Sequence, residues 1–161
     1  MLDLKSKAGQ VSEQGYCVIE SVYDEHECIQ IRAIFQELCH KKGGFSNEQS
    51  TISFHPLLEW GPEMAPFYAK PILVDLMAEV FNDDVRLAHS GAAVFNNALV
   101  SPVLTGRHNH YSWEISETGL QRHNPERVLC NVYIDGTMPD VGPLIVLPRS
   151  LNTSIHNEGE A

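Results

Sequence analysis

The sequence predicts an α+β domain in which helices come first and a sandwich or barrel of short strands follows. Apolar side chains recur at helical spacing in the first half of the chain, whereas short apolar or alternating runs separated by turn residues begin at about residue 85. No helical pattern lies between those later strands, which argues against a doubly wound parallel sheet. With 161 residues, the chain is long enough for one domain with a sizeable core.

Composition and charge narrow the class of protein. Hydrophobic residues make up 43% of the chain and charged residues 20%, as in a folded globular domain. The net charge of −10 should repel nucleic acid and anionic membranes, so we expect neither as a partner. The sequence has no apolar run of membrane-spanning length and no signal-peptide pattern, so we expect a cytoplasmic protein. The four cysteines form no CxxC pair, and we expect them to be reduced and mostly buried.

Cap and turn residues predict the first elements. Gly15 interrupts the chain, and the β-branched and aromatic residues of Tyr16–Glu20 predict a short strand after it. Asp24, with Glu27 three residues later, is typical of a capping box at the start of a helix. Gly43-Gly44 predicts the end of that helix. Its apolar stripe consists of Cys28, Ile31, Phe35 and Leu38.

The middle of the chain is predicted to be irregular before a second helix begins. Residues 45–62 contain Pro56 and other breakers, which favour loops. Pro71–Phe81 is predicted to be a helix, because proline suits the first helical position and the apolar residues form one wide face. Asn82 and the two aspartates after it should end the helix. The strands predicted after this helix are Val85–His89, Ala92–Asn96, Val128–Ile134 and Leu144–Leu147.

His108 and His110 are the strongest candidates for metal ligands. Residues two apart in a strand point to the same face, so both imidazoles could bind one ion. Neutral imidazole suits iron, zinc, copper and nickel. Such pairs also occur as surface or hydrogen-bonded core histidines, so the spacing alone leaves both interpretations open.

The segment Arg127–Ser150 is typical of a strand, a tight acidic turn and a second strand. Within it, Asn131 and Tyr133 alternate with apolar neighbours. This alternation predicts a strand with polar groups on one face, which either faces solvent or contributes to a site.

Three stretches together resemble the phytanoyl-CoA dioxygenase family of Fe(II)- and 2-oxoglutarate-dependent oxygenases. Val11–Asp24 resembles the family's entry segment, in which a Gly-aromatic pair leads into an apolar strand and then a helix. The sequence Gly-Pro-Leu-Ile-Val-Leu-Pro-Arg-Ser-Leu, which ends at Leu151, resembles its Gly-Pro-Leu and Pro-Gly-Ser-His signature. His108-Asn-His110 falls where the family has its His-x-Asp metal motif. The resemblance covers nearly the whole chain.

The resemblance implies a double-stranded β-helix, a cupin-like jelly roll with N-terminal helices packed outside. It implies an oxidoreductase that hydroxylates a small organic or acyl substrate with O₂, Fe(II) and 2-oxoglutarate as co-substrate. On this basis His108 is the first metal ligand, and His110 occupies the position of the family's aspartate ligand. Asn131 lies on the strand that the family uses beside the co-substrate, so the resemblance implies that it contacts 2-oxoglutarate.

The sequence departs from the family pattern in three places. His110 contributes no negative charge, and Glu114 is a conceivable substitute carboxylate. Arg149-Ser150-Leu151 lacks the glycine and histidine of the signature. The family's distal histidine and its 2-oxoglutarate-binding arginine lie on later strands. We therefore expect residues 1–161 to form a single domain that is truncated at its C-terminus and lacks the last strands. If catalysis requires those strands, we expect this chain alone to be inactive.

Two alternatives remain open. The chain could be a non-catalytic jelly-roll protein that binds a metal or a small molecule. It could also be a cupin-like zinc or iron enzyme that needs no 2-oxoglutarate, although cupins lack a helical first half. Of the isolated histidines, His55 before Pro56 is expected in a loop, and His89 could line the mouth of a barrel.

Overall fold

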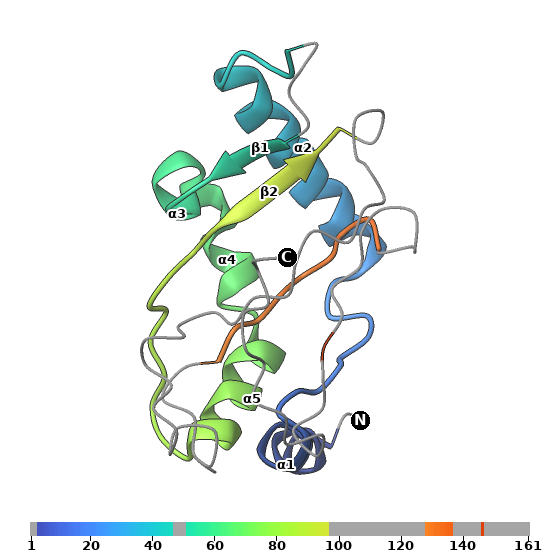
Figure 1. Cartoon of the computed structure of the whole chain (residues 1–161), viewed down its shortest axis with the longest axis vertical. Coiled ribbons are helices and arrows are strands. Elements are labelled where there is room, and N and C mark those ends of the chain that lie inside the picture. Colours follow the sequence, from blue (N-terminus) through green and yellow to red (C-terminus); the bar gives the residue numbers. More distant parts are fainter. Residues whose placement is uncertain (1–2, 47–50, 97–127, 137–145, 147–161) are drawn as a thin grey trace, which may run out of the picture.

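The computed structural model describes residues 3–46, 51–96, 128–136 and 146 (Figure 1). The described residues combine helices with a two-stranded antiparallel sheet, and these two strands neither show nor exclude the predicted jelly roll. In these ranges no helix has both the length and the apolar character needed to cross a membrane. The elements in chain order are α1 (Leu4–Gln14), α2 (Glu25–Lys41), β1 (Thr51–Phe54), α3 (Leu57–Trp60), the 3₁₀ turn η1 (Pro62–Met64), α4 (Ala65–Tyr68), α5 (Pro71–Phe81) and β2 (Ala92–Phe95).

Helix α1 is an element that the sequence analysis does not predict. The Asp3 side chain accepts a hydrogen bond from the Ser6 amide at 3.1 Å, which caps the helix at its start. Gly15, at a φ of 88°, ends it in the left-handed conformation that glycine adopts without steric cost. The predicted strand Tyr16–Glu20 is wrong, because these residues pair with no strand among the described residues.

The prediction of helix α2 is confirmed, from its capping box to its end before the glycine pair. The Asp24 side chain accepts from the Glu27 amide, and the Glu27 carboxylate accepts from the Asp24 amide, both at 2.8 Å. Ile31 and Leu38 are the fully buried members of the apolar stripe, with exposed fractions of 1% and 0%. After Lys41 the chain turns away through two glycines with positive φ.

Strands β1 and β2 form the antiparallel pair. Ile52 lies opposite Val94 and Phe54 opposite Ala92, and this alternate set of side chains faces the core. The prediction of an irregular stretch over residues 45–62 is therefore wrong for β1 and α3. The predicted strand Ala92–Asn96 is confirmed to within one residue, whereas Val85–His89 forms no strand, since no ladder partner lies beside it in the described parts of the chain.

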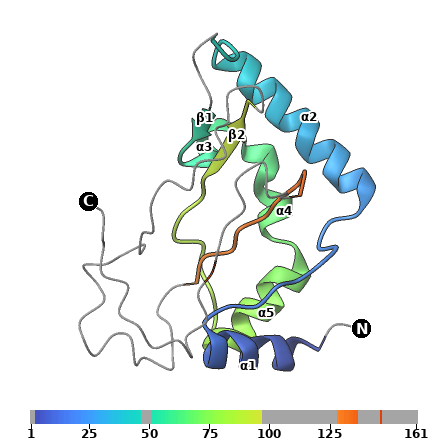
Figure 2. The same cartoon turned by 45° about the vertical axis from the view of Figure 1, so that its right-hand side comes forward.

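The core lies between α2 and the inner face of the sheet. Figures 1 and 2 show α2 crossing one face of the sheet, with α1 and α5 at the far end of the molecule. Six buried side chains, drawn from α2, β1, α3 and η1, form one cluster: Ile31, Leu38, Ile52, Phe54, Leu57 and Met64. Gly61, just before η1, packs closely against α2, since a Cβ atom there would lie 3.0 Å from a methyl carbon of Leu38.

Helix α5 has the bounds that the sequence predicts. Pro71 occupies its first position and Asn82, in the left-handed conformation, ends it. Leu73 and Leu76 are its buried residues, and the helix packs against α1. This contact gives the otherwise weakly apolar α1 a partner.

The segment 128–136 runs extended beside α2 and α4, as Figure 2 shows, but forms no strand. The predicted strand Val128–Ile134 is therefore wrong in this structure. Its turn prediction is confirmed, because the backbone bends at Asp135 and Gly136 has a φ of 74°. The predicted strand Leu144–Leu147 lies outside the described residues except for Val146.

A partly buried ion pair connects α2 to the start of α5. The Lys70 ammonium donates to the Glu27 carboxylate, and both side chains keep only about a quarter of their surface exposed, at 23% and 25%. The same ammonium lies 5.1 Å from the ring centre of Tyr23, whose hydroxyl donates to the Phe67 carbonyl at 2.8 Å. The Lys70 hydrogen bond, followed by the one from the Asp24 amide, lowers the pKa of Glu27.

We expect Leu38→Ala to lower the free energy of unfolding by about 3 kcal/mol, since it removes a fully buried side chain and leaves a cavity in the main cluster. Urea unfolding followed by circular dichroism measures the change. Ile29→Ala on the same helix is the matched control, because Ile29 is 54% exposed, and it should cost less than about 0.5 kcal/mol. Equal losses in the two variants would contradict the packing described here.

The lowered pKa of Glu27 predicts a pH-dependent contribution to stability. The folded state favours the ionised carboxylate, so the contribution is present above the ordinary pKa of 4.5 and disappears as pH falls through the lowered folded value. Glu27→Gln should therefore be less stable than wild type at pH 7, and the two should converge under acid. Glu37→Gln, at an exposed position on the same helix, serves as control in thermal melts from pH 3 to pH 7. A constant difference between Glu27→Gln and wild type would contradict this assignment.

Candidate functional site

The predicted metal ligands His108 and His110 lie outside the described residues. Asn131, the predicted 2-oxoglutarate contact, lies in the described segment 128–136 and is exposed. The structure therefore gives a position to one of the three site residues that the sequence predicts.

The neighbours of Asn131 do not show the predicted alternation of two faces. Residues 129–133 are all exposed, including Leu129 at 59% and Tyr133 at 49%. Ile134, the last apolar residue of the segment, packs against the main core cluster. The segment thus contacts the core at its end and leaves the Asn131 amide open to solvent.

A two-bond contact holds the segment to α2. The Arg32 guanidinium donates through Nε to the Asp135 carboxylate at 2.6 Å and through a terminal nitrogen to the Ile134 carbonyl at 3.1 Å. Both side chains are substantially exposed, at 44% for Arg32 and 80% for Asp135. We call these two bonds the Arg32 fork. The fork holds the end of the segment, at Asp135, four residues beyond Asn131, and leaves that end exposed.

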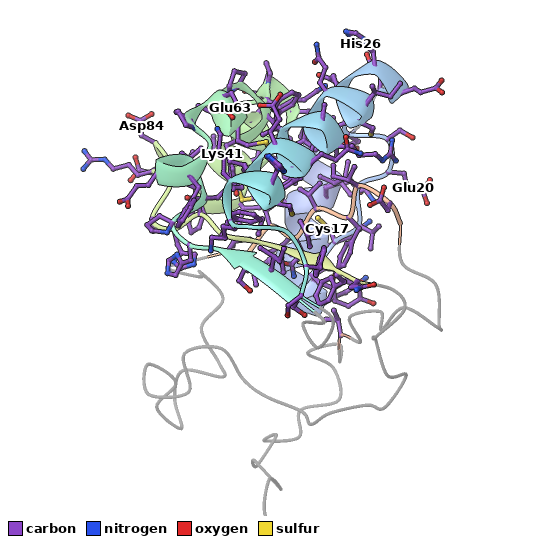
Figure 3. The ribbon with its side chains drawn as sticks, turned by 90° about the horizontal axis from the view of Figure 1, so that it is seen from above. Cys17, Glu20, His26, Lys41, Glu63 and Asp84 are labelled. Atoms are coloured by element: carbon purple, nitrogen blue, oxygen red, sulfur yellow. The ribbon has the colours of Figure 1, made fainter. Side chains whose placement is uncertain are left out.

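The thiols of Cys17 and Cys130 and the phenol of Tyr23 lie where this segment passes α2 and α4, and their pKa values are raised. Figure 3 shows Cys17 close to the segment, and the charge of its thiolate would interact with that of Cys130. Burial raises the pKa of Cys17, and desolvation raises that of Cys130 although the residue as a whole is exposed. Desolvation, followed by the influence of Cys130, raises the pKa of Tyr23 to about 12. At neutral pH these groups are protonated, which argues against a nucleophilic cysteine here.

The cysteine predictions are confirmed only in part. All four thiols are free, as expected. Cys17, Cys28 and Cys39 are half-buried, whereas Cys130 is exposed, so the expectation that they are mostly buried is wrong.

The structure brings together two histidines that the sequence analysis treats separately. Their imidazole rings, His55 after β1 and His89 before β2, have centres 4.1 Å apart and planes tilted by 47°. Neither ring is buried, since both residues are exposed.

Ser90 fixes the positions of both histidines. It is buried, with 6% exposed, and is the one buried polar residue in the described ranges. Its carbonyl accepts from the Leu57 amide at 3.0 Å and from His55 Nδ1 at 3.4 Å. Its hydroxyl accepts from the Leu58 amide at 3.4 Å. The loop before β2 is thereby tied to the turn after β1, with the two imidazoles side by side.

The two imidazoles line an open pocket of about 240 Å³. Its lining comprises His55, Pro56, Leu58, Leu87, Ala88, His89 and Ser90. A neutral imidazole offers one donor and one acceptor nitrogen, so the pocket can bind a metal ion or a hydrogen-bonding ligand. Sequence reasoning did not bring the two histidines together, because only the pairing of β1 with β2 places His55 beside the loop that holds His89 and Ser90.

A second hollow, of about 630 Å³, lies over α5 and α1. Its lining includes Asp75, Glu79, Asp83 and Asp84, so it is strongly acidic. Across the described parts of the chain, no three histidine, cysteine, aspartate or glutamate side chains converge in a way that could hold a metal ion.

Comparison of the chain with family models, with curated proteins and with solved structures finds no match.

We expect Arg32→Ala to release the segment that carries Asn131 from α2, because it removes both bonds of the fork. Amide hydrogen exchange measured by mass spectrometry should become several-fold faster over residues 128–136 and stay unchanged in α2. Lys41→Ala, which truncates an exposed residue on the same helix, should leave both regions as in wild type. Unchanged exchange in Arg32→Ala would show that other contacts hold the segment.

Proposed function

We propose that the chain is a non-haem Fe(II)- and 2-oxoglutarate-dependent dioxygenase that hydroxylates a small organic or acyl substrate. One observation carries the proposal, namely the order of motifs along the sequence. A His-x-His motif at His108 and His110 precedes a predicted hairpin with the Gly-Pro-Leu and Leu-Pro elements of the phytanoyl-CoA dioxygenase signature.

The donor set suits the proposed metal. Two neutral imidazoles and one further oxygen ligand would satisfy Fe(II) and leave positions for the co-substrate and O₂. Bound iron with 2-oxoglutarate would supply the oxidising power for hydroxylation at an unactivated C–H bond. In this proposal His108 and His110 hold the metal and keep it oriented.

Asn131 would contact the co-substrate. Its side-chain NH₂ can donate a hydrogen bond to a 2-oxoglutarate carboxylate, and its amide oxygen can accept one. The exposure of Asn131 supports this role, because a small anion can reach it from solvent. Its link through the segment to the Arg32 fork would limit its motion relative to α2.

A second candidate function has its own supporting observation. His110 stands where the resembled family has an aspartate, so the proposed site lacks the negative charge of that ligand. The Arg149-Ser150-Leu151 sequence also lacks the glycine and histidine of the signature. Both departures favour a non-catalytic jelly-roll protein that binds a metal or a small molecule without turning it over.

Anaerobic calorimetric titration of the 161-residue chain with Fe(II) tests the proposed ligands. His108→Ala and His110→Ala should each weaken iron binding by about tenfold or more, since each removes a ligand. His40→Ala, at an exposed position at the end of α2, is the control and should bind as wild type does. Unchanged iron affinity in both ligand variants would refute the iron site.

Succinate release from 2-oxoglutarate in the presence of Fe(II) and O₂ separates the two candidate functions. Release that falls in His108→Ala and rises in His110→Asp, which restores a carboxylate ligand, would support the dioxygenase. The assay uses a protein that also carries any strands encoded after Ala161. Iron binding without succinate release in either wild type or His110→Asp of that protein would favour the binding protein.

A further inference from the structure

We propose that His55 and His89 together bind a divalent transition-metal ion of the zinc type in the pocket beside Ser90. The proposal uses none of the residues of the proposed iron site. It rests on the contact between the two rings, the orientation of His55 and the accessibility of the pocket.

The separation of the rings suits a shared metal ion. Zinc–imidazole bonds are about 2.0–2.1 Å long, so two nitrogens on one ion lie about 3 Å apart. The ring centres lie 4.1 Å apart, and the 47° tilt opens the pair toward one side. With His55 held by its hydrogen bond to Ser90, a rotation of the His89 side chain would bring one of its nitrogens to an ion bound at His55 Nε2, without a movement of either backbone segment.

The hydrogen bond of His55 leaves one nitrogen available for a metal. A carbonyl oxygen can only accept, so His55 Nδ1 carries the proton in its 3.4 Å contact with the Ser90 carbonyl. The lone pair then resides on Nε2. Metal-binding histidines commonly donate their other ring nitrogen to a backbone carbonyl in this way, which fixes the tautomer and the ring orientation. Ser90 is buried, and its carbonyl also accepts a hydrogen bond from the Leu57 amide, so the carbonyl is held in place.

The pocket provides room and access for the remaining ligands. Both histidines are exposed, and the open volume of about 240 Å³ holds several water molecules. With two protein ligands from the described residues, water completes the coordination, and we expect affinity below that of a closed structural zinc site. Two imidazoles favour zinc, copper and nickel over magnesium and calcium, which prefer oxygen ligands.

A metal ion at this site would connect two segments that are far apart in the sequence. His55 belongs to the turn between β1 and α3, and His89 to the loop that enters β2. The ion would add a direct link beside the hydrogen bonds of Ser90. Because the two rings come together only in the folded chain, binding should raise the midpoint of thermal unfolding.

The test uses a chain that has no polyhistidine tag and carries the substitutions His108→Ala and His110→Ala. The proposed iron ligands therefore cannot contribute to zinc binding. Zinc is titrated calorimetrically, and ring signals of the histidines are followed by NMR. We expect one equivalent of zinc to bind, with the signals of His55 and His89 shifting and the melting midpoint rising. Magnesium at the same concentration should produce none of these changes.

His89→Phe is the decisive variant, because it keeps an aromatic ring against His55 and removes the metal-binding nitrogens. We expect it to fold, to weaken zinc binding by at least about tenfold and to lose the zinc-dependent rise in melting midpoint. His55→Phe should do the same, and His40→Phe, outside the pocket, should bind zinc like its parent. Zinc affinity unchanged in both pocket variants, or zinc shifts confined to other histidines, would overturn the proposal. Because the iron ligands are absent throughout, this failure is independent of failure of the iron titration.

Discussion

The burial of β1 against α2 is the constraint on which the other described elements depend. Ile52 and Phe54 are 2% and 0% exposed, and they pack against the similarly buried Ile31 and Leu38 of α2. Phe54 also contacts the rings of Phe35 and Trp60, each with centres 6.1 Å away. Close packing of this kind fixes both the orientation and the register of a short strand. The position of β2 follows from that register, and so does the position of His55, the next residue after Phe54.

Much of the helical part of this fold can be predicted from the sequence, since its signals are local. The capping box of α2, its apolar stripe, and the Pro71 start and Asn82 end of α5 all lie within one helix or beside it. Helix α1 has equally clear caps, but Val11 is its one buried residue, so no apolar stripe indicates it. Strand β1 is only four residues long and pairs with residues about forty positions later, which a reading of local periodicity does not detect.

The two candidate sites also differ in whether local sequence signals can predict them. His108, His110 and Asn131 can be proposed from spacing and from motif order, which are properties of the sequence alone. The contact between His55 and His89 is a consequence of tertiary structure, because it requires β1 to pair with β2 and the Ser90 carbonyl to meet the turn before α3. Ser90 shows how a small polar residue can determine the position of larger functional groups. Its two oxygens accept from three donors on the facing turn, and among the described residues no buried side-chain nitrogen or oxygen lacks a hydrogen-bond partner.

The Arg32 fork bears on the order in which the chain folds. Its partners are separated by 103 positions along the chain, so forming it first would close a very long loop. The entropic cost of closure grows with the logarithm of loop length, by about 0.6 kcal/mol for each doubling, and an exposed ion pair contributes little against such a cost. The α2–sheet unit, whose contacts are nearer in sequence, should therefore assemble first and shorten the effective loop. Docking of residues 128–136 is then a late event, and during synthesis it can occur only after this segment has itself left the ribosome, when α2 and both strands have already emerged.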